Sequence, residues 1–323
     1  RCPRRDSPFT DQRMCPLTVV MYHYVRDRSA SAYPNIPALD ARDFRRQVDM
    51  MLRRGSIVSM EQVIHSMESG EDLPPQSFLL TFDDGYADHY DVVFPVLFEA
   101  GVTGSFYPPV AALEGQVLDV NKIHFLLASV AADSLRATVD AFVALRGAEY
   151  GLGSPESYWD AWGHANRWDD ATTIYVKRML QRGLPSEVRS ELASTLFADH
   201  VTSDERAFAS ELYASREQLR EMVTEGMHVG CHSVTHRWLD SLSPSEQRAE
   251  VEGSLDLLQA LGVEVEKGWT LAYPYGAWNE AILPVLSELG CAAAFTVEAR
   301  TCDLAADNRF LLPRLDTMDL KGW

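Results

Sequence analysis

The sequence has few positive charges for its length. Of its 323 residues, 29 are Lys or Arg and 47 are Asp or Glu, which gives a formal net charge of −18 at pH 7. Proteins that bind nucleic acids need clustered Lys and Arg, so this balance argues against a nucleic-acid partner. It equally disfavours docking on an anionic membrane surface. We therefore expect neutral or cationic partners.

Long apolar runs are also missing. The longest, at residues 17–22, has only the length of a strand, whereas a membrane-spanning helix needs about 20 apolar residues. We therefore expect no integral membrane segment. Apolar residues still make up 46% of the chain, which is normal for a globular protein with a full core.

Cysteine is scarce and scattered, at Cys2, Cys15, Cys231, Cys291 and Cys302. This odd set argues against a disulfide framework, and only Cys2 with Cys15 makes a pair to consider. Mostly reduced thiols favour a cytoplasmic location. Because the chain begins at Arg1 rather than Met, a trimmed N-terminus and a secreted protein stay open as the alternative. The sequence gives no indication of oligomeric state.

Short apolar runs alternate with amphipathic stretches along most of the chain. Strands are expected at residues 17–22, 57–59, 78–82, 103–107, 227–232, 269–273, 292–297 and 310–315. Of the helices between them, Asp40 and Ser243 are expected to cap two, and Ser215 with Gln218 forms a capping box for a third. About eight strands and nearly as many helices indicate an α/β barrel or a doubly wound sheet.

The alternation breaks at residues 109–214, where the apolar spacing is helical only. This stretch is larger than a usual connection between a strand and a helix. We therefore expect one domain over residues 1–323 with a helical insertion at 109–214. Its tryptophans, Trp159, Trp162 and Trp168, are expected either to stack on sugar faces or, more commonly, to anchor the core of a small helical subdomain.

Two carboxylates and a glycine end the strand at residues 78–82. In parallel α/β folds the C-terminal ends of the strands face the active site. Because side chains alternate along a strand, Asp83 and Asp84 are expected to diverge, one toward a metal and the other toward a bound water. Gly85 permits a positive φ or a close backbone approach. The alternative is a plain Asp-Asp-Gly turn, which is common.

Two histidines, His232 and His236, stand four residues apart after the strand at 227–232. They lie on one face if the segment is helical, a spacing that suits a single divalent ion such as Zn²⁺. An isolated pair of this kind is more often structural. With one Asp at another strand end, however, the pair makes a two-His-one-carboxylate set with open positions for water and substrate. His23 is a third histidine at the end of a strand.

A further strand ends in Tyr273-Pro274-Tyr275-Gly276. Pro and Gly define a loop and leave backbone N–H groups free, and such groups serve as oxyanion donors. Taken alone, this segment is more typical of a turn that ends a strand.

These three segments, in this order, resemble the polysaccharide deacetylase family, also called carbohydrate esterase family 4 or the NodB homology domain. The residues that carry the resemblance are Thr81-Phe82-Asp83-Asp84-Gly85, His232-Ser233-Val234-Thr235-His236 and Tyr273-Pro274-Tyr275-Gly276. Met21-Tyr22-His23 and Pro313-Arg314 resemble the branch of the family with a YPYG third motif. The resemblance covers about two-thirds of the chain and implies a distorted, TIM-like (β/α) barrel of about seven strands.

The resemblance also implies the metal chemistry. Asp84, His232 and His236 are expected to hold one divalent ion, with Zn²⁺ first and Co²⁺, Ni²⁺, Mn²⁺ or Fe²⁺ as alternatives. Metal-bound water attacks the acyl carbon, and Asp83 is the general base that takes its proton. The third motif, with Tyr273, Pro274 and the backbone N–H of Tyr275, is expected on the oxyanion and substrate side.

The chain departs from the family pattern at two places. Family members often carry an Arg where this chain has Ala272, and Arg314 is our candidate to orient Asp83 instead. The alternative for Arg314 is a surface salt bridge. The late Leu-His-Asp motif that supplies the acid is absent, because no histidine follows His236. His23 is the candidate acid, and a structural histidine at the barrel mouth is its alternative.

Within the insertion, Asn121-Lys122-Ile123-His124 weakly resembles a segment of deacetylases from bacterial surface-glycan clusters. One interpretation has Lys122 and His124 contact a substrate phosphate or carboxylate. The other, which we favour, is a helix start with exposed polar residues.

We therefore expect a metal-dependent hydrolase that removes an N-acyl group, with acetyl first, from an amino sugar of a glycan or of a lipid- or nucleotide-linked sugar. Deacylation or deformylation of a non-sugar amide on the same scaffold is one alternative. A non-catalytic carbohydrate-binding barrel is another, motivated by Ala272 and the missing late histidine. A purely structural metal domain is disfavoured, because structural zinc sites are usually closed by four protein ligands.

Overall fold

The computed structural model describes residues 16–29, 31–166 and 169–320. Cys2, Cys15 and Trp168 therefore lie outside the described residues. The described cysteines, Cys231, Cys291 and Cys302, are buried and free. Among the described helices, none combines the length and the apolar composition needed to cross a membrane.

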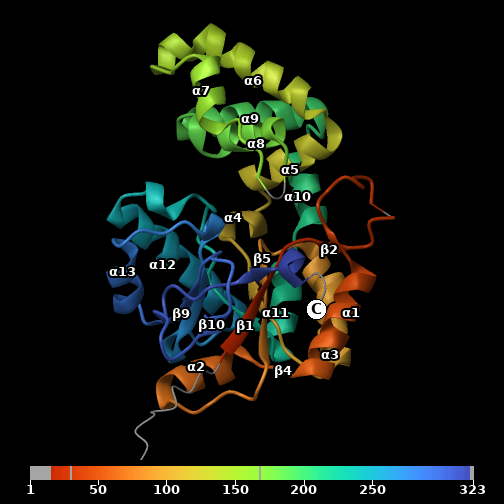
Figure 1. The fold of residues 1–323 in the computed structure, drawn as a ribbon, viewed down its shortest axis with the longest axis vertical. Helices are drawn as coiled ribbons and strands as arrows, with labels where there is room; N and C mark the ends of the chain where they lie inside the picture. The colour runs from red at the N-terminus through yellow and green to blue at the C-terminus, as the bar shows by residue number, and fades with distance from the viewer. Residues whose placement is uncertain (1–15, 30, 167–168, 321–323) are drawn as a thin grey trace, which may run out of the picture.

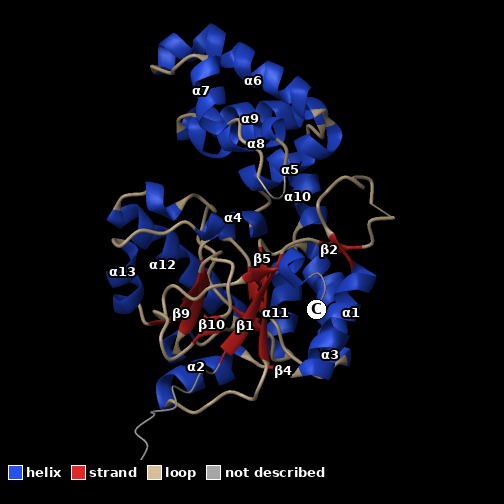
Figure 2. Ribbon diagram, viewed as in Figure 1, coloured by secondary structure: helices blue, strands red, loops and turns tan. Residues whose placement is uncertain are grey.

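Strands lie at the centre of the lower part of the molecule (Figure 2), and the parallel pairings among them run around a ring. In order around the ring these strands are β1 (Pro16–Tyr22), β5 (Ser77–Asp83), β6 (Ser105–Tyr107), β7 (His228–Val229), β8 (Trp269–Ala272), β9 (Cys291–Phe295) and β11 (Leu315–Asp316), which returns to β1. Single parallel bridges, Cys231 with Leu271 and Phe295 with Leu312, connect β7 to β8 and β9 to the segment before β11. The expected distorted barrel is confirmed for the described part of the chain.

Short strands and helices surround the ring (Figure 1). The short strands are β2 (Val25–Arg26), β3 (Leu39–Asp40), β4 (Ser56–Ile57) and β10 (Cys302–Asp303). The helices are α1 (Ala41–Arg54), α2 (Met60–Ser69), α3 (Phe94–Glu99), α11 (Arg216–Thr224), α12 (Pro244–Leu261) and α13 (Ile282–Glu288). As expected, the side chains of Asp40 and Ser243 cap α1 and α12, and Ser215 forms a capping box with Gln218 on α11.

The core of the barrel is built on the apolar side chains of its strands. Tyr22, Phe82 and Phe106 come from three neighbouring strands and stack in a row, with ring centroids 4.9 and 4.8 Å apart. All three are fully buried. Stacked aromatic pairs of this kind stabilise a core beyond the area that they bury.

Between β6 and α11 the described elements are all helical. They are α4 (Val110–Leu113), α5 (Asp119–Ser129), α6 (Ala132–Arg146), α7 (Pro155–Trp162), α8 (Ala171–Arg178), α9 (Ser186–His200) and α10 (Glu205–Leu212), joined in places by single turns of 3₁₀- or π-helix. We call residues 109–214 the helical insertion. Helices α6 to α9 stack at one end of the molecule, and α5 and α10 lie between this stack and the barrel (Figure 1).

The helical insertion has an apolar cluster of its own, which includes Ile123, Val139 and Tyr175. Trp159 and Trp162 pack against this cluster, and the guanidinium carbon of Arg136 lies 3.5 Å from the ring centroid of Trp159. These two tryptophans are partly buried and therefore pack on the edge of the core of the helical insertion.

Candidate metal centre

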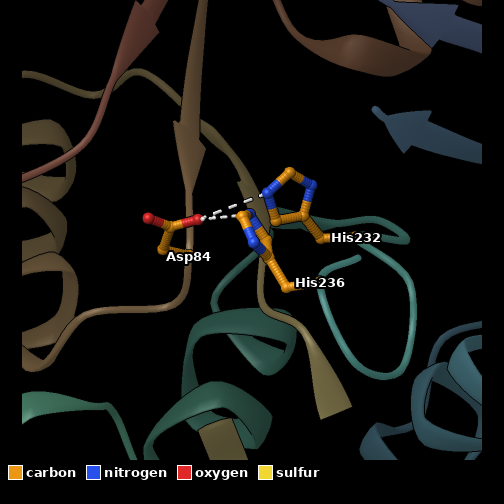
Figure 3. A group of neighbouring side chains, drawn as sticks. All are labelled: Asp84, His232 and His236. Carbon is orange, nitrogen blue, oxygen red and sulfur yellow. Dashed lines mark ion pairs between the residues drawn. The ribbon is translucent and has the colours of Figure 1, made fainter. Parts of the chain in front are cut away.

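Asp84, His232 and His236 lie together beyond the ends of β5 and β7, as Figure 3 shows. Nε2 of His232 lies 3.3 Å and Nε2 of His236 lies 3.2 Å from Oδ1 of Asp84. Each residue offers one ligand atom, and these atoms all lie within 4.8 Å of one another. All three side chains are buried. One carboxylate oxygen and two imidazole nitrogens form a donor set that suits zinc and similar divalent ions.

The hydrogen bonds around this cluster also fit a bound cation. Nδ1 of His232 lies 2.7 Å from the carbonyl oxygen of Ala272, so the Nδ1–H donates there and the Nε2 lone pair faces Asp84. Oδ1 of Asp84 and Nδ1 of His236 are buried and have no hydrogen-bond partner among the described residues. A buried carboxylate oxygen without a hydrogen-bond donor, facing two imidazole nitrogens, fits a role as a ligand of a divalent cation.

The two aspartates diverge because the backbone turns sharply between them. Asp83 is the last residue of β5, whereas Asp84 and Gly85 are in the left-handed region, with φ of 72° and 70°. Gly85 also faces Pro108 so closely that a Cβ on it would lie 2.8 Å from the Cβ of Pro108. A side chain at position 85 would therefore be strained by both φ and contact.

A loop, not a helix face, brings the two histidines together. Ser233 and His236 have φ of 64° and 57°, which no regular helix contains, so the helical arrangement considered from their spacing is wrong. Oγ of Ser233 accepts a hydrogen bond of 3.0 Å from the N–H of His236. The two left-handed residues fold the chain back, which places both rings on one side of the loop.

Glu250 of α12 stabilises the histidine loop through hydrogen bonds. Its carboxylate accepts hydrogen bonds from the N–H of Val234 at 2.9 Å, the N–H of Thr235 at 2.8 Å and the Thr235 hydroxyl at 2.5 Å. Glu250 is buried, so these bonds, with one from Arg237, compensate the loss of water around its charge. The sequence did not identify Glu250, because a residue in a separate helix shares no spacing with the motif.

Asp83 forms a buried, two-pronged ion pair with Arg314. Nη1 and Nη2 of Arg314 donate to Oδ1 and Oδ2 of Asp83 at 2.8 and 2.7 Å. The guanidinium also donates to the Thr81 hydroxyl at 3.2 Å and the Thr296 carbonyl at 3.0 Å. Arg314 is 1% exposed, so the alternative of a surface salt bridge is wrong. Arg314 lies next to Asp83 because it directly precedes β11, and β11 pairs with β1, the neighbour of β5.

The electrostatics keep both carboxylates ionised. Burial opposes the ionisation of Asp83, but Arg314 and then His232 outweigh it and lower the pKa of Asp83 below its ordinary value. Burial likewise opposes the ionisation of Asp84, but His236 and His232 hold its pKa well below the ordinary value. Burial lowers the pKa of His236 against the opposing charge of Asp84. An ionised Asp84 beside a neutral His236 is the combination of protonation states that binds a cation.

His23 lies at the same edge, just after β1. It is half-buried, and its charge contributes to the lowered pKa of both Asp83 and Asp84. Its carbonyl oxygen accepts a hydrogen bond of 2.9 Å from Nε2 of His89. His89 is buried, and burial lowers its pKa to about 4.

The third motif meets the metal centre through Tyr275. Its ring centroid lies 4.8 Å from that of His236, and its backbone is left-handed with φ of 59°. Pro274 is buried just before it. The Tyr273 hydroxyl instead donates to the Phe310 carbonyl at 3.0 Å inside the core. The Tyr275 side chain therefore faces the histidines, and the Tyr273 side chain does not.

An aromatic platform continues from Tyr275 toward the helical insertion. The Trp238 ring stacks on Tyr275 with centroids 4.3 Å apart and planes 7° apart. The guanidinium carbons of Arg182 and Arg178 lie 4.7 and 5.8 Å from the Trp238 ring centroid. Both arginines belong to the helical insertion, which thus borders the site.

The segment Asn121–His124 does not have the exposed polar residues that we favoured. Asn121 and Lys122 are 0% and 6% exposed. The Lys122 ammonium lies 2.9 Å from the Ser194 hydroxyl and 3.0 Å from a Glu205 carboxylate oxygen, so it joins α5 to α9 and α10. Asn121 is hydrogen-bonded to Tyr86 at 2.6 Å. The polar residues of α5 are thus internal contacts.

Tyr86 is a contact of Asp84 that the sequence did not indicate. Its hydroxyl donates to Oδ2 of Asp84 at 2.5 Å, and its ring is fully buried. Burial and the Asp84 charge hold the pKa of Tyr86 well above its ordinary value, so it stays a donor. Its position two residues after Asp84 was the only signal available.

Comparisons of the sequence agree with this geometry. The family described as "Polysaccharide deacetylase" matches residues 168–294, a stretch that holds the second and third motifs. The curated protein "Putative polysaccharide deacetylase YxkH" of Bacillus subtilis (strain 168) is 27% identical over 86 residues. That alignment covers 27% of this chain and 30% of YxkH, so the chain spans about a third of this relative.

Solved structures with the same fold cover nearly the whole chain. The deacetylase PplD of Streptococcus pyogenes, in complex with acetate, has a TM-score of 0.58 at 18% identity and covers 94% of this chain and 92% of its own. IcaB of Ammonifex degensii has a TM-score of 0.54 at 19% identity, covering 94% and 93%. The deacetylase domain of BpsB from Bordetella bronchiseptica has a TM-score of 0.54 at 18% identity, covering 94% and 96%. The family match and the curated relative thus make part of the chain similar to polysaccharide deacetylases, and the solved structures show that nearly the whole chain shares their fold.

Proposed function

We propose that the protein is a metal-dependent hydrolase that removes an N-acyl group from an amino sugar. Acetyl is the leading candidate for this acyl group. The observation that carries this proposal is the buried Asp84–His232–His236 cluster beside Asp83, which Arg314 holds ionised. A binding module has no need of a buried, arginine-held carboxylate next to a metal site.

Asp84, His232 and His236 would hold the cation, with Zn²⁺ first among the candidates. A bound divalent cation supplies Lewis acidity, which makes water more acidic and polarises the amide carbonyl. The three ligands leave further positions for water and substrate, as catalytic sites require. Co²⁺, Ni²⁺, Mn²⁺ and Fe²⁺ stay alternatives, because the same donor set accepts them.

Asp83 would act as the general base. Arg314 occupies one lone pair on each carboxylate oxygen, which leaves the others to accept a proton from the attacking water. The water oxygen bonds to the acyl carbon, its proton passes to Asp83, and the C–N bond then breaks. The products are a carboxylate, which is acetate when the acyl group is acetyl, and a free amine.

The remaining two roles fall to His23 and Tyr275. His23 lies near both aspartates and would protonate the leaving amine. The backbone N–H of Tyr275 would stabilise the oxyanion, with its left-handed φ of 59° setting the direction of the peptide. The stacked Tyr275–Trp238 pair offers an apolar face of the kind on which sugar rings pack.

The experiment is to measure acetate release from N-acetylglucosamine oligomers before and after chelation, and again after Zn²⁺ is restored. Chelation should abolish release, and Zn²⁺ should restore it. Asp83→Asn should lower kcat by about 10²–10⁴-fold while zinc still binds. Full activity after rigorous metal removal would contradict the metal-dependent mechanism. Unchanged turnover in Asp83→Asn would remove Asp83 as the base. A parallel series of N-acetyl and N-formyl amides without a sugar separates the non-sugar alternatives.

A further inference from the structure

A buried chain of hydrogen bonds joins the helical insertion to Asp84. Tyr86 donates to Oδ2 of Asp84 at 2.5 Å, and Nδ2 of Asn121 donates to the Tyr86 hydroxyl at 2.6 Å. Oδ1 of Asn121 accepts from the Tyr213 hydroxyl at 2.5 Å, and Nδ2 also donates to Tyr24 at 2.8 Å. Tyr86 and Asn121 are fully buried, and Tyr24 and Tyr213 are 3% and 4% exposed.

Elementary chemistry determines the direction of each bond. An ionised carboxylate only accepts, so Tyr86 must spend its single hydrogen on Asp84. The Tyr86 oxygen is then left to accept, so Asn121 must present its amide nitrogen to Tyr86 and its amide oxygen to Tyr213. Both N–H groups and the carbonyl of Asn121 are therefore used in one directed chain that ends on Asp84. Successive bonds in such a chain polarise one another in the same sense.

The backbone reinforces this connection. Tyr86 and Tyr213 form an antiparallel β-bridge, and the N–H of Ala214 donates to the Gly85 carbonyl at 3.0 Å. The exit of the helical insertion is thus joined to the loop that carries Asp84. Asn121, in α5, enters the same contact from the other end of the helical insertion.

We propose that Asn121 is a positioning residue for the metal centre, acting on Asp84 through Tyr86. The bond from Tyr86 occupies Oδ2 and restricts rotation of the carboxylate, which leaves Oδ1 facing Nε2 of His232 and of His236. The inference rests on the proposed metal-dependent function. With this role for Asn121, the helical insertion helps to position a ligand of the cation and does not merely border the site.

The test is the Zn²⁺ affinity of the metal-free full chain, measured by competition with a chromophoric chelator. Tyr86→Phe, which keeps the ring, should weaken Zn²⁺ binding by about 10–100-fold, the usual effect of losing a partner that orients a ligand. Asn121→Ala should weaken it in the same direction. Because Asn121 acts through Tyr86, the double variant should bind Zn²⁺ about as weakly as Tyr86→Phe alone.

Tyr175→Phe is the matched control. Tyr175 is a buried tyrosine of the helical insertion that donates to Oδ1 of Asp140 at 2.5 Å, the same type of bond at the same length as Tyr86 to Asp84. Its loss should leave the Zn²⁺ affinity at the wild-type value. An equal loss of Zn²⁺ affinity in Tyr175→Phe would show that the loss in Tyr86→Phe comes from general destabilisation of the fold. That result would overturn the proposal.

Three results separate the outcomes. Wild-type Zn²⁺ affinity in Asn121→Ala, or losses that add in the double variant, would overturn the positioning role while leaving the metal centre intact. Absence of Zn²⁺ binding by the wild-type chain would instead contradict the proposed function itself. If Asn121→Ala does not fold, Tyr213→Phe replaces it, because that variant keeps Asn121 and removes the donor to its Oδ1, together with the acceptor for the N–H of Leu118. It should weaken Zn²⁺ binding by less than Tyr86→Phe, and an unchanged affinity would count against the directed chain.

Discussion

Arg314 binds both carboxylate oxygens of Asp83, at 2.8 and 2.7 Å, across 231 residues of sequence. The pair is buried inside the strand ring, so neither charge is compensated by water. Breaking a buried pair from one side is costly because it leaves the other charge alone. This relationship explains how the chain dispenses with an arginine at position 272, where Ala272 is buried in β8.

Replacing Arg314 should affect both stability and the pH dependence of activity. Arg314→Ala leaves Asp83 as an unpaired buried carboxylate and should cost about 3–5 kcal/mol of unfolding free energy. Because Arg314 lowers the pKa of Asp83, its removal raises that pKa, so the ionised base is lost at a higher pH. Arg314→Gln removes the charge and keeps a donor, so its activity should fall on the acid side at higher pH than that of the wild type. An unchanged acid limb of kcat/KM in the glutamine variant would argue against this coupling.

Removal of one proposed ligand should remove zinc binding. His236→Ala deletes one of the two imidazoles next to Oδ1 of Asp84, and Zn²⁺ affinity should fall by at least about 100-fold, with activity falling in parallel. The matched control is His65→Ala, because the His65 side chain is 65% exposed on α2. Zinc titration and acetate release check both variants. Equal zinc affinity in the two variants would rule out His236 as a ligand.

Zinc itself should stabilise the fold of the wild-type protein. A ligand that binds only the native state at 100 times its Kd adds about 2.7 kcal/mol to the unfolding free energy. Thermal unfolding of the metal-free chain, with and without added Zn²⁺, measures this gain. The gain should vanish in His236→Ala and persist in His65→Ala.

Glu250 should matter for the loop that carries the histidines. Glu250→Gln replaces one accepting oxygen by an NH₂ group that faces the backbone donors of Val234 and Thr235. We expect a loss of about 1–3 kcal/mol in unfolding free energy and weaker zinc binding. Glu252→Gln on the same helix is the control, since the Glu252 side chain is 51% exposed. If denaturant unfolding gives the same loss of unfolding free energy for both variants, the hydrogen bonds of Glu250 do not stabilise the loop as proposed.

His89 should make stability depend on pH. Burial lowers its pKa from 6.5 to about 4, so the native state resists its protonation. The contribution of His89 to the unfolding free energy is fully present above pH 6.5, the ordinary pKa of histidine. It is lost as the pH falls toward 4, by up to about 3 kcal/mol. His89→Gln, which keeps a donor near the His23 carbonyl, should flatten this decline, and His65→Gln should not. Urea unfolding at several pH values gives the slopes, and parallel slopes in wild type and His89→Gln would contradict the prediction.

Much of the architecture followed from local patterns. Capping residues such as Asp40, Ser215 and Ser243 mark helix starts because their side chains satisfy free N–H groups of the first turn. Apolar runs mark the strands of a parallel ring because both faces of such strands are buried. Some lengths were wrong. The expected strand at 227–232 has regular pairing only in β7, His228–Val229, and a single bridge at Cys231 continues it.

The conformation of the histidine loop could not be obtained from spacing. Residues four apart meet on a helix face, but a loop with left-handed Ser233 and His236 produces the same proximity. The two cases differ only in backbone angles, and the anchor that selects the loop is Glu250 in another helix. The burial of Asn121 and Lys122 was missed for a similar reason, because nothing in α5 alone indicates which helices cover it.

The local sequence was sufficient for the order of the main strands, the caps and the residue types of the candidate metal centre. It placed Asp83, Asp84, His232 and His236 at the same edge, because parallel strands end side by side. Tertiary structure decided the partners: Arg314 for Asp83, and Tyr86 with the helical insertion for Asp84. These contacts depend on how the ring closes and how the helical insertion packs, and such long-range geometry leaves no periodic trace in the chain.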